Sequence, residues 1–164
     1  MNKEDFERIL NNLKMRFNDM DFYSYIDFLK RVEKDIYHSL LADNPMGLDP
    51  ETFTNGRILN YLLEDKEFSS KVGDKIKSES VADPWRYFRG LLDGKLELDT
   101  LLNLFRDENL LKIAEDKYHA YKLLGALCEK DTDSVIRFAL QNETFYTILK
   151  EISIKQELTL YVVD

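Results

Sequence analysis

The sequence predicts an all-α fold: a compact bundle of about seven to nine helices, with a short C-terminal strand or hairpin left open. Apolar residues recur at helical spacing through most of the 164 residues. Residues that interrupt helices are few, with 3 prolines and 6 glycines in the chain. Hydrophobic residues make up 44% of the chain, too many for a disordered protein. We therefore expect a single helical domain over residues 1–164.

The first two helices are indicated by apolar residues on one side and charged residues on the other. Apolar side chains at i, i+3, i+4, i+7 and i+11 predict a helix over residues 3–17. Residues 18–21 (Asn-Asp-Met-Asp) then offer a cap for a second helix over residues 21–42. The second helix has its main apolar positions at Phe22, Ile26, Leu29, Ile36 and Leu40, and its expected exposed face carries Asp27, Lys30, Arg31, Glu33, Lys34 and Asp35.

Residues 43–50 are predicted to form a loop. Two prolines and a glycine within this stretch exclude a continuous helix. Asp49-Pro50 reads as the cap and first residue of the next helix, because proline suits the first helical position. Asn55-Gly56 can delay the start of that helix.

Two further helices are expected before residue 95. A polar helix with apolar residues four apart is predicted over residues 66–78. Residues 77–82 are polar and break the periodicity, which makes them a weak linker candidate within the single domain. Asp83-Pro84 repeats the cap-and-proline start and predicts another helix, which ends at Asp93-Gly94.

Residues 96–128 are the predicted centre of the fold. They read as two helices that break near residues 106–109, and the second is the most apolar helix in the sequence. We expect a core hairpin against which the other helices pack. Beyond it, Asp131 caps a short helix and Asn142 starts another.

The C-terminal tail leaves two structures open. Residues 158–163 (Leu-Thr-Leu-Tyr-Val-Val) are β-branched and aromatic, which favours a strand with residues 152–154 as its partner. Alternatively, the last helix runs on. No fixed repeat period recurs along the chain, so a compact bundle is favoured over an armadillo-like array.

The charge balance limits the class of partner. A formal net charge of −8 argues against general nucleic-acid binding, which needs clustered Lys and Arg, and against adsorption to anionic lipid. One cysteine, Cys128, cannot form an intramolecular disulfide and reads as a core thiol. No leader pattern and no apolar run of roughly 20 residues is visible, so we expect a cytoplasmic protein without membrane contact.

Motifs for metal or cofactor chemistry are weak. Glu115 and His119 lie at i, i+4, but a metal site in a bundle needs several such pairs. Residues 131–133 (Asp-Thr-Asp) begin like a calcium loop but lack its glycine and closing glutamate, so helix capping explains them better. Gly94-Lys95 lacks the other residues of a phosphate-binding loop. We expect no metal, no cofactor and no catalytic residues.

The strongest functional signal is the aromatic and basic cluster at residues 85–89 (Trp-Arg-Tyr-Phe-Arg). Trp, Tyr and Arg dominate binding hot spots because they combine large area with directed hydrogen bonds. The alternative is that the aromatics join the core and the arginines pair with local acids. The candidate partner-binding residues are Trp85, Arg86, Tyr87 and Arg89, with weaker candidates Met46 and Leu48 in the proline-bounded loop and Tyr23 opposite Ile26.

We interpret the sequence as a small acidic protein-binding module that modulates or inhibits a protein partner, in the manner of inhibitors, immunity proteins or phage anti-defence proteins. Acids in residues 43–83 would suit a partner with a basic surface. Two alternatives stay open. One is a structural or homo-oligomeric subunit, such as a homodimer. The other is an enzyme whose site is assembled from dispersed carboxylates and arginines.

Overall fold

The computed structural model describes residues 1–106, 117–147 and 150–151, and within these ranges every regular element is a helix. This confirms the predicted all-α fold. The predicted strand at residues 158–163 and its partner at residues 152–154 lie outside the described residues. The α-helices are α1 (Lys3–Arg16), α2 (Phe22–Ala42), α3 (Ile58–Leu62), α4 (Lys66–Ser80), α5 (Pro84–Leu92), α6 (Leu98–Leu104) and α8 (Lys117–Gln141), and the short 3-10 helices are η1 (Phe17–Asp19) and η2 (Pro50–Phe53).

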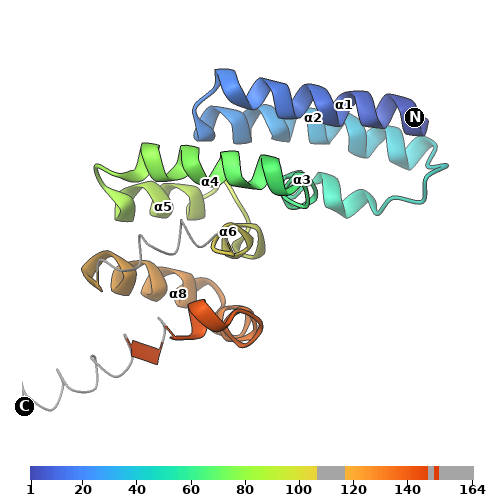
Figure 1. Ribbon diagram of the computed structural model, residues 1–164. Coiled ribbons are helices and arrows are strands. Elements are labelled where there is room, and N and C mark those ends of the chain that lie inside the picture. Colours follow the sequence, from blue (N-terminus) through green and yellow to red (C-terminus); the bar gives the residue numbers. More distant parts are fainter. Residues whose placement is uncertain (107–116, 148–149, 152–164) are drawn as a thin grey trace, which may run out of the picture.

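The helices are stacked in layers (Figure 1). α1 and α2 form an antiparallel pair at one end, α4 and α5 form a second antiparallel pair, and α8 lies beyond α5. α3 contacts α2 and α6, while α6 contacts α5 and α8, so these two short helices connect neighbouring layers. α5 itself contacts α4 and α8, and so lies between them.

Lys75 of α4 holds the end of the first helix in place. Its ammonium group donates hydrogen bonds to the carbonyl oxygens of Phe17 and Met20, the latter at 2.5 Å. Carbonyls at a helix end lack intrahelical partners, so a donor from another helix satisfies them. The buried Phe17 ring packs edge-on against Tyr25 and Phe68, with ring centroids 5.0 and 5.2 Å apart. Aromatic side chains therefore fill the space between α1, α2 and α4.

The start of α2 is capped from a distant helix. Asp21 stands at the predicted cap position, but its side chain makes no capping hydrogen bond to any residue that the structure describes. Instead, the Phe22 N–H donates to Glu79 of α4, with 2.9 Å to Oε1. The Tyr87 hydroxyl of α5 donates to the other carboxylate oxygen at 3.0 Å. The predicted local cap is wrong because a carboxylate from α4 is close enough to replace it.

The helix predicted after Pro50 is divided in two. Asp49 accepts a hydrogen bond from the Glu51 N–H at 3.0 Å, as a cap should, but only η2 follows. Asn55 and Gly56 then take positive φ angles of 55° and 81°, which no α-helix contains. A methyl group at Gly56 would lie 3.1 Å from a Leu96 side-chain atom, so the turn also fits tightly. The expected delay at Asn55-Gly56 is confirmed, and α3 begins at Ile58.

The predicted linker at residues 77–82 is largely helical. α4 continues to Ser80, and the Ser80 side chain is buried. Asp83 then accepts a hydrogen bond from the Arg86 N–H at 3.1 Å and starts α5, as the cap-and-proline pattern predicts. The organisation of residues 1–164 as one domain stays a prediction.

α8 is kinked where the sequence predicts a new helix. The backbone of Asp131 leaves the helical region (φ −166°, ψ 98°), and its side chain accepts a hydrogen bond from the Ser134 N–H at 3.3 Å. Asp131 therefore caps the second half of α8 at this kink. Asn142 accepts from the Phe145 N–H at 3.0 Å and starts the helical turn over residues 143–147, as predicted.

The predicted central hairpin contributes to the core where it is described, while residues 107–116 lie outside the described residues. No helix in the described ranges is long and apolar enough to cross a membrane. The buried hydrophobic residues from the predicted hairpin are Leu96, Leu101, Leu102, Leu104, Phe105, Leu124, Ala126 and Leu127.

Candidate protein-binding surface

α5 and the first half of α8 lie side by side and run in the same direction (Figure 1). Near their N-terminal ends, the Lys122 ammonium lies 5.9 Å from the centre of the Trp85 ring. One to two turns later, the Arg89 guanidinium approaches Glu129 at 3.7 Å. We call this line of paired side chains the α5–α8 seam. It crosses between helices that are distant in the sequence.

Trp85 lies on this seam, and Arg86 follows it on the exposed side of α5. The Trp85 ring is half-buried, and the Arg89 guanidinium lies 5.9 Å from the ring centre, within the range of a cation–π contact. Arg89 also pairs with Asp93 at 3.1 Å, so its head is positioned by α5 itself. The Arg86 side chain is 89% exposed and is held loosely by Asp83 at 3.8 Å. The Trp85 side chain is therefore only partly covered, and the Arg86 side chain is largely exposed to solvent.

The seam ends in an open groove of about 490 Å³. Its apolar lining comes from Leu92 of α5, from Leu96 in the segment before α6, and from Leu98, the first residue of α6. At the rim, Arg57 pairs with Glu97 at 2.5 Å, which fixes both side chains. The kink of α8 supplies the opposite wall. The lining residues are Arg57, Leu92, Leu96, Glu97, Leu98, Asp99, Lys130, Asp131 and Ser134.

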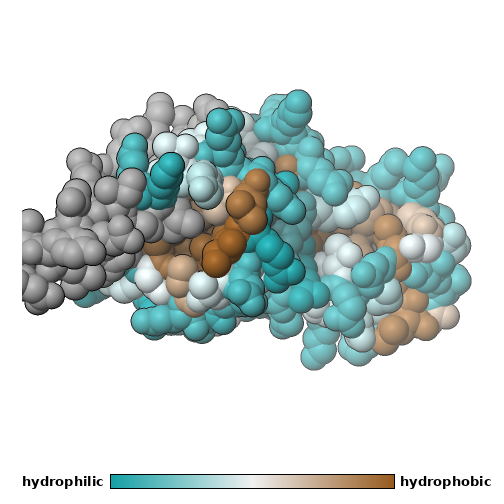
Figure 2. Space-filling model, turned by 90° about the horizontal axis from the view of Figure 1, so that it is seen from below, coloured by the Kyte–Doolittle hydropathy of each residue, from teal (hydrophilic) through white to brown (hydrophobic). Residues whose placement is uncertain are grey.

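A second apolar surface lies on the distal half of α8. Leu140 is 71% exposed, and Ile136 and Tyr146 are also exposed. Figure 2, which views the end of the molecule formed by α8, shows hydrophobic side chains at the surface among hydrophilic ones. At about 100° per residue, Ile136 and Leu140 lie on the opposite flank of the helix from Ser134, which lines the groove. These residues are therefore separate from the groove.

Tyr23 and Tyr87 face each other between α2 and α5, away from the seam. The Tyr23 hydroxyl donates to the Tyr87 carbonyl oxygen, and the two ring centroids are 5.2 Å apart. Gly90 makes this approach possible, because a methyl group there would overlap the Tyr23 hydroxyl. Burial, followed by the nearby Glu79 carboxylate, raises the pKa of both phenols. These two candidates join helices in the structure.

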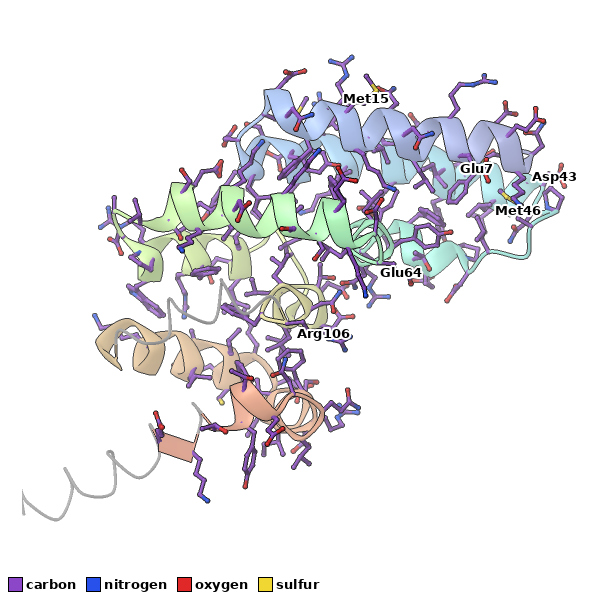
Figure 3. All side chains as sticks on the ribbon, viewed as in Figure 1. Glu7, Met15, Asp43, Met46, Glu64 and Arg106 are labelled. Carbon is purple, nitrogen blue, oxygen red and sulfur yellow. The ribbon has the colours of Figure 1, made fainter. Side chains whose placement is uncertain are left out.

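Met46 and Leu48 lie at the far end of the α1–α2 layer, where Figure 3 labels Met46 beside Asp43. Both side chains are half-buried and pack against the core. The Asn44 side chain closes the loop by accepting from the Leu48 N–H at 3.0 Å and donating to its carbonyl oxygen at 2.6 Å. The structure thus places Trp85 and Arg89 in contact, with Arg86 on the same helix, but neither Met46 nor Leu48 joins them.

Glu33 is a site residue that the sequence analysis missed. It was expected on the exposed face of α2, but it is 1% exposed, so that prediction is wrong. The signal was its register: position 33 lies four residues after Leu29 and three before Ile36, on the buried stripe of the helix. Its Oε2 accepts a hydrogen bond from the Gly56 N–H at 3.1 Å, which stabilises the turn before α3. Desolvation raises the pKa of this carboxyl to about 7.

Other reactive groups are not gathered into a cluster where the chain is described. The described residues contain no group of three or more His, Cys, Asp or Glu side chains that could hold a metal ion. His38 is exposed, as predicted, while the Glu115 and His119 side chains lie outside the described residues. Cys128 is half-buried, and burial raises the pKa of its thiol, which makes it less reactive.

Comparison with known proteins adds no relative: no family model, no curated protein and no solved structure matches this chain.

Proposed function

We propose that this protein is a protein-binding module that acts by recognition rather than by catalysis. The proposal rests on Trp85 and the exposed Arg86 near the start of α5, the helix whose last residue, Leu92, lines the groove at the end of the α5–α8 seam. Trp and Arg are the side chains that most often dominate binding energy. The groove, at about 490 Å³, falls within the roughly 300–1,000 Å³ typical of binding pockets. An apolar side chain of the partner would enter the groove while Arg86 binds the partner nearer the start of α5.

Charge supports a partner with a basic surface. The net charge of −8 favours encounter with a positively charged partner. Within residues 43–83, the exposed acids include Asp43, Glu51 and Asp74. A small acidic module that covers a basic working surface inhibits the protein that carries it. We therefore propose a regulatory, inhibitory role in the cytoplasm.

The direct test is capture of the partner with the tagged full chain from its native cell, followed by titration of the purified pair. Arg86→Ala should weaken binding about tenfold or more, because it removes a directed, partly desolvated contact worth roughly 1.4 kcal/mol or more. Thermal stability should stay nearly unchanged, because the side chain is 89% exposed.

Arg8→Ala is the matched control. Arg8 is also an exposed helical arginine, at 78%, and it has the same loose i, i+3 pair with an aspartate at 3.8 Å. This variant should bind as the wild type does. Equal losses from both variants would mean that Arg86 acts only through net charge, and unchanged binding by Arg86→Ala would remove the seam as the binding surface.

Self-association is the second candidate, and the exposed Ile136 and Leu140 favour it. An obligate homodimer would bury this apolar face against its copy. Sizing of the purified protein separates the two functions: a monomer supports heterologous binding, whereas a dimer that Leu140→Lys dissociates supports a homo-oligomeric subunit.

A further inference from the structure

The turn at residues 54–57, which joins η2 to α3, contacts both Glu33 and the wall of the groove at the end of the α5–α8 seam. The Gly56 N–H donates to Glu33 Oε2 at 3.1 Å. A methyl group at Gly56 would lie 3.1 Å from a Leu96 side-chain atom and 3.3 Å from the Lys95 carbonyl oxygen. The turn is therefore packed tightly between α2 and the segment before α6.

Three residues that line the groove are held by this turn. Arg57 belongs to the turn and lines the groove itself. Its guanidinium pairs with Glu97 at 2.5 Å, and the Asn55 side chain donates to the other oxygen of that carboxylate at 3.0 Å. Leu96, which packs against Gly56, also lines the groove, as Glu97 does. One side of the groove is thus built on the turn.

Glu33 is a buried acid behind this turn. It is 1% exposed, and burial raises the pKa of its carboxyl to about 7, although hydrogen bonds from the Gly56 and Ile58 N–H groups act in the opposite direction. The ionised carboxylate bears its desolvation cost only while the turn is closed, because water solvates it once the turn opens. Ionisation of Glu33 therefore favours an open turn, and the neutral acid favours a closed one.

A cleft of about 270 Å³ beside the turn gives it room to open. The cleft lies between α2 and the segment that begins with η2, and Thr54 and Asn55 of the turn form part of its lining. Movement of these two residues would admit water to Glu33 without unfolding α2.

We propose that the turn at residues 54–57 is a pH-sensitive switch for the groove. Neutral Glu33 holds the turn closed, and ionised Glu33 loosens it, together with Leu96 and the Arg57–Glu97 pair of the groove wall. This inference concerns regulation of the groove, so its biological role rests on the proposed function. Its test needs no partner, so a failed switch and a failed binding surface give different results.

Charged groups lie around Glu33 on the elements packed against it. Lys30 and Arg57 both attract its ionised form, but burial outweighs them. Histidine is the side chain whose charge ordinarily changes between about pH 5 and about pH 8, so His38 of α2 requires a control. The charged and titratable groups in these segments are Lys30, Lys34, Tyr37 and His38 of α2, Glu51 of η2, Arg57 before α3, and Lys95 and Glu97 before α6.

The test is amide hydrogen exchange of the full chain at about pH 5 and about pH 8, with each rate corrected for the intrinsic effect of pH. Between a pKa of 4.5 in the open turn and about 7 in the closed one, the opening equilibrium rises about tenfold per pH unit. Protection of the Gly56 and Leu96 amides should therefore fall on the order of 50-fold. The Val72 amide, in the middle of α4, reports opening of the whole fold and should stay more protected at both pH values.

Glu33→Gln keeps an acceptor for the Gly56 N–H but cannot ionise, so its turn should be equally protected at both pH values. Glu51→Gln, at an exposed glutamate of η2, and His38→Gln, at an exposed histidine of α2, are the matched controls and should keep the wild-type response. If Glu33→Gln fails to fold, the carbon-13 shift of the Glu33 carboxyl in the wild type replaces it. The midpoint of that titration should coincide with the fall in Gly56 protection.

The switch is overturned if Gly56 and Leu96 exchange at the same rate as Val72, because the opening is then global. Protection that does not change with pH, or a wild-type change that persists in Glu33→Gln, would also overturn it. A response of Gly56 without Leu96 contradicts it as well, because the turn then opens without affecting the groove.

Discussion

At Glu33, burial of the carboxyl makes stability depend on pH. Desolvation raises the pKa of the folded-state carboxyl from 4.5 to about 7. The neutral form is therefore favoured by folding, and the stability it contributes is complete below pH 4.5 and lost as the pH rises through about 7. The loss amounts to roughly 3 kcal/mol, at 1.36 kcal/mol per pKa unit.

Urea unfolding of wild type and Glu33→Gln at about pH 5 and about pH 8 measures this loss. The wild type should lose more stability than the variant between the two values, because glutamine does not ionise. The same decline in both proteins would show that the carboxyl is not destabilised by burial.

Gly90 is the second residue whose role depends on one close contact. Alanine normally stabilises a helix interior by about 1 kcal/mol relative to glycine. At Gly90 the added methyl would overlap the Tyr23 hydroxyl, which is held by its hydrogen bond to the Tyr87 carbonyl oxygen. Gly90→Ala should therefore destabilise the protein by about 1–3 kcal/mol, the usual cost of overpacking.

Gly125→Ala supplies a control of opposite sign. Gly125 also lies inside a helix, but an added methyl there would meet no described atom within 4 Å. This variant should gain up to about 1 kcal/mol in thermal or urea unfolding. If both variants shift stability in the same direction, helix propensity and not the contact with Tyr23 governs Gly90.

At the scale of elements, Glu79 links the start of α2 to α4 and α5. Its carboxylate accepts from the Phe22 N–H at 2.9 Å and from the Tyr87 hydroxyl at 3.0 Å. Glu79→Ala leaves both donors without their partner, so unfolding should become easier by about 1–3 kcal/mol. Asp21→Ala should change stability much less, since Asp21 caps no residue that is described.

A double-mutant cycle of Glu79→Ala with Tyr87→Phe isolates the hydrogen bond between them. The two changes share one contact, so their effects should be non-additive by about 0.5 kcal/mol or more. Additive effects would mean that Glu79 acts through α2 alone.

At the scale of the whole molecule, net charge affects the rate at which the protein associates with the proposed partner. A chain with a net charge of −8 should associate faster with a basic partner at low salt. Raising the salt from about 0.1 to 1 M shortens the screening length from about 10 to 3 Å, so the association rate should fall several-fold. Dissociation should change less, because short-range contacts within the complex are screened less than the long-range attraction that steers the encounter. An association rate that does not respond to salt would exclude a basic partner surface.

The layered arrangement also explains which part of the candidate surface could be predicted. The Trp85–Arg89 cluster was found from residue type, because Trp, Tyr and Arg dominate binding hot spots. The part of the surface that α8 contributes was not predicted, because Lys122 and the kinked wall of α8 are distant from this cluster in the sequence. Helical spacing predicts which residues share a face, but it does not predict which helix that face meets.

The sequence by itself determined the helical class and most helix starts. Asp83 caps α5 and Asn142 caps the last helical turn through hydrogen bonds that span three residues. Each of these helix starts is therefore determined by residues that are close in the sequence. The tertiary structure alone decided the roles of Glu33, Glu79 and Tyr23, whose partners lie 23, 57 and 64 residues away. A carboxylate or phenol looks the same in sequence whether it faces water or another helix. Only packing, by removing water and supplying a distant donor or acceptor, settles which it is.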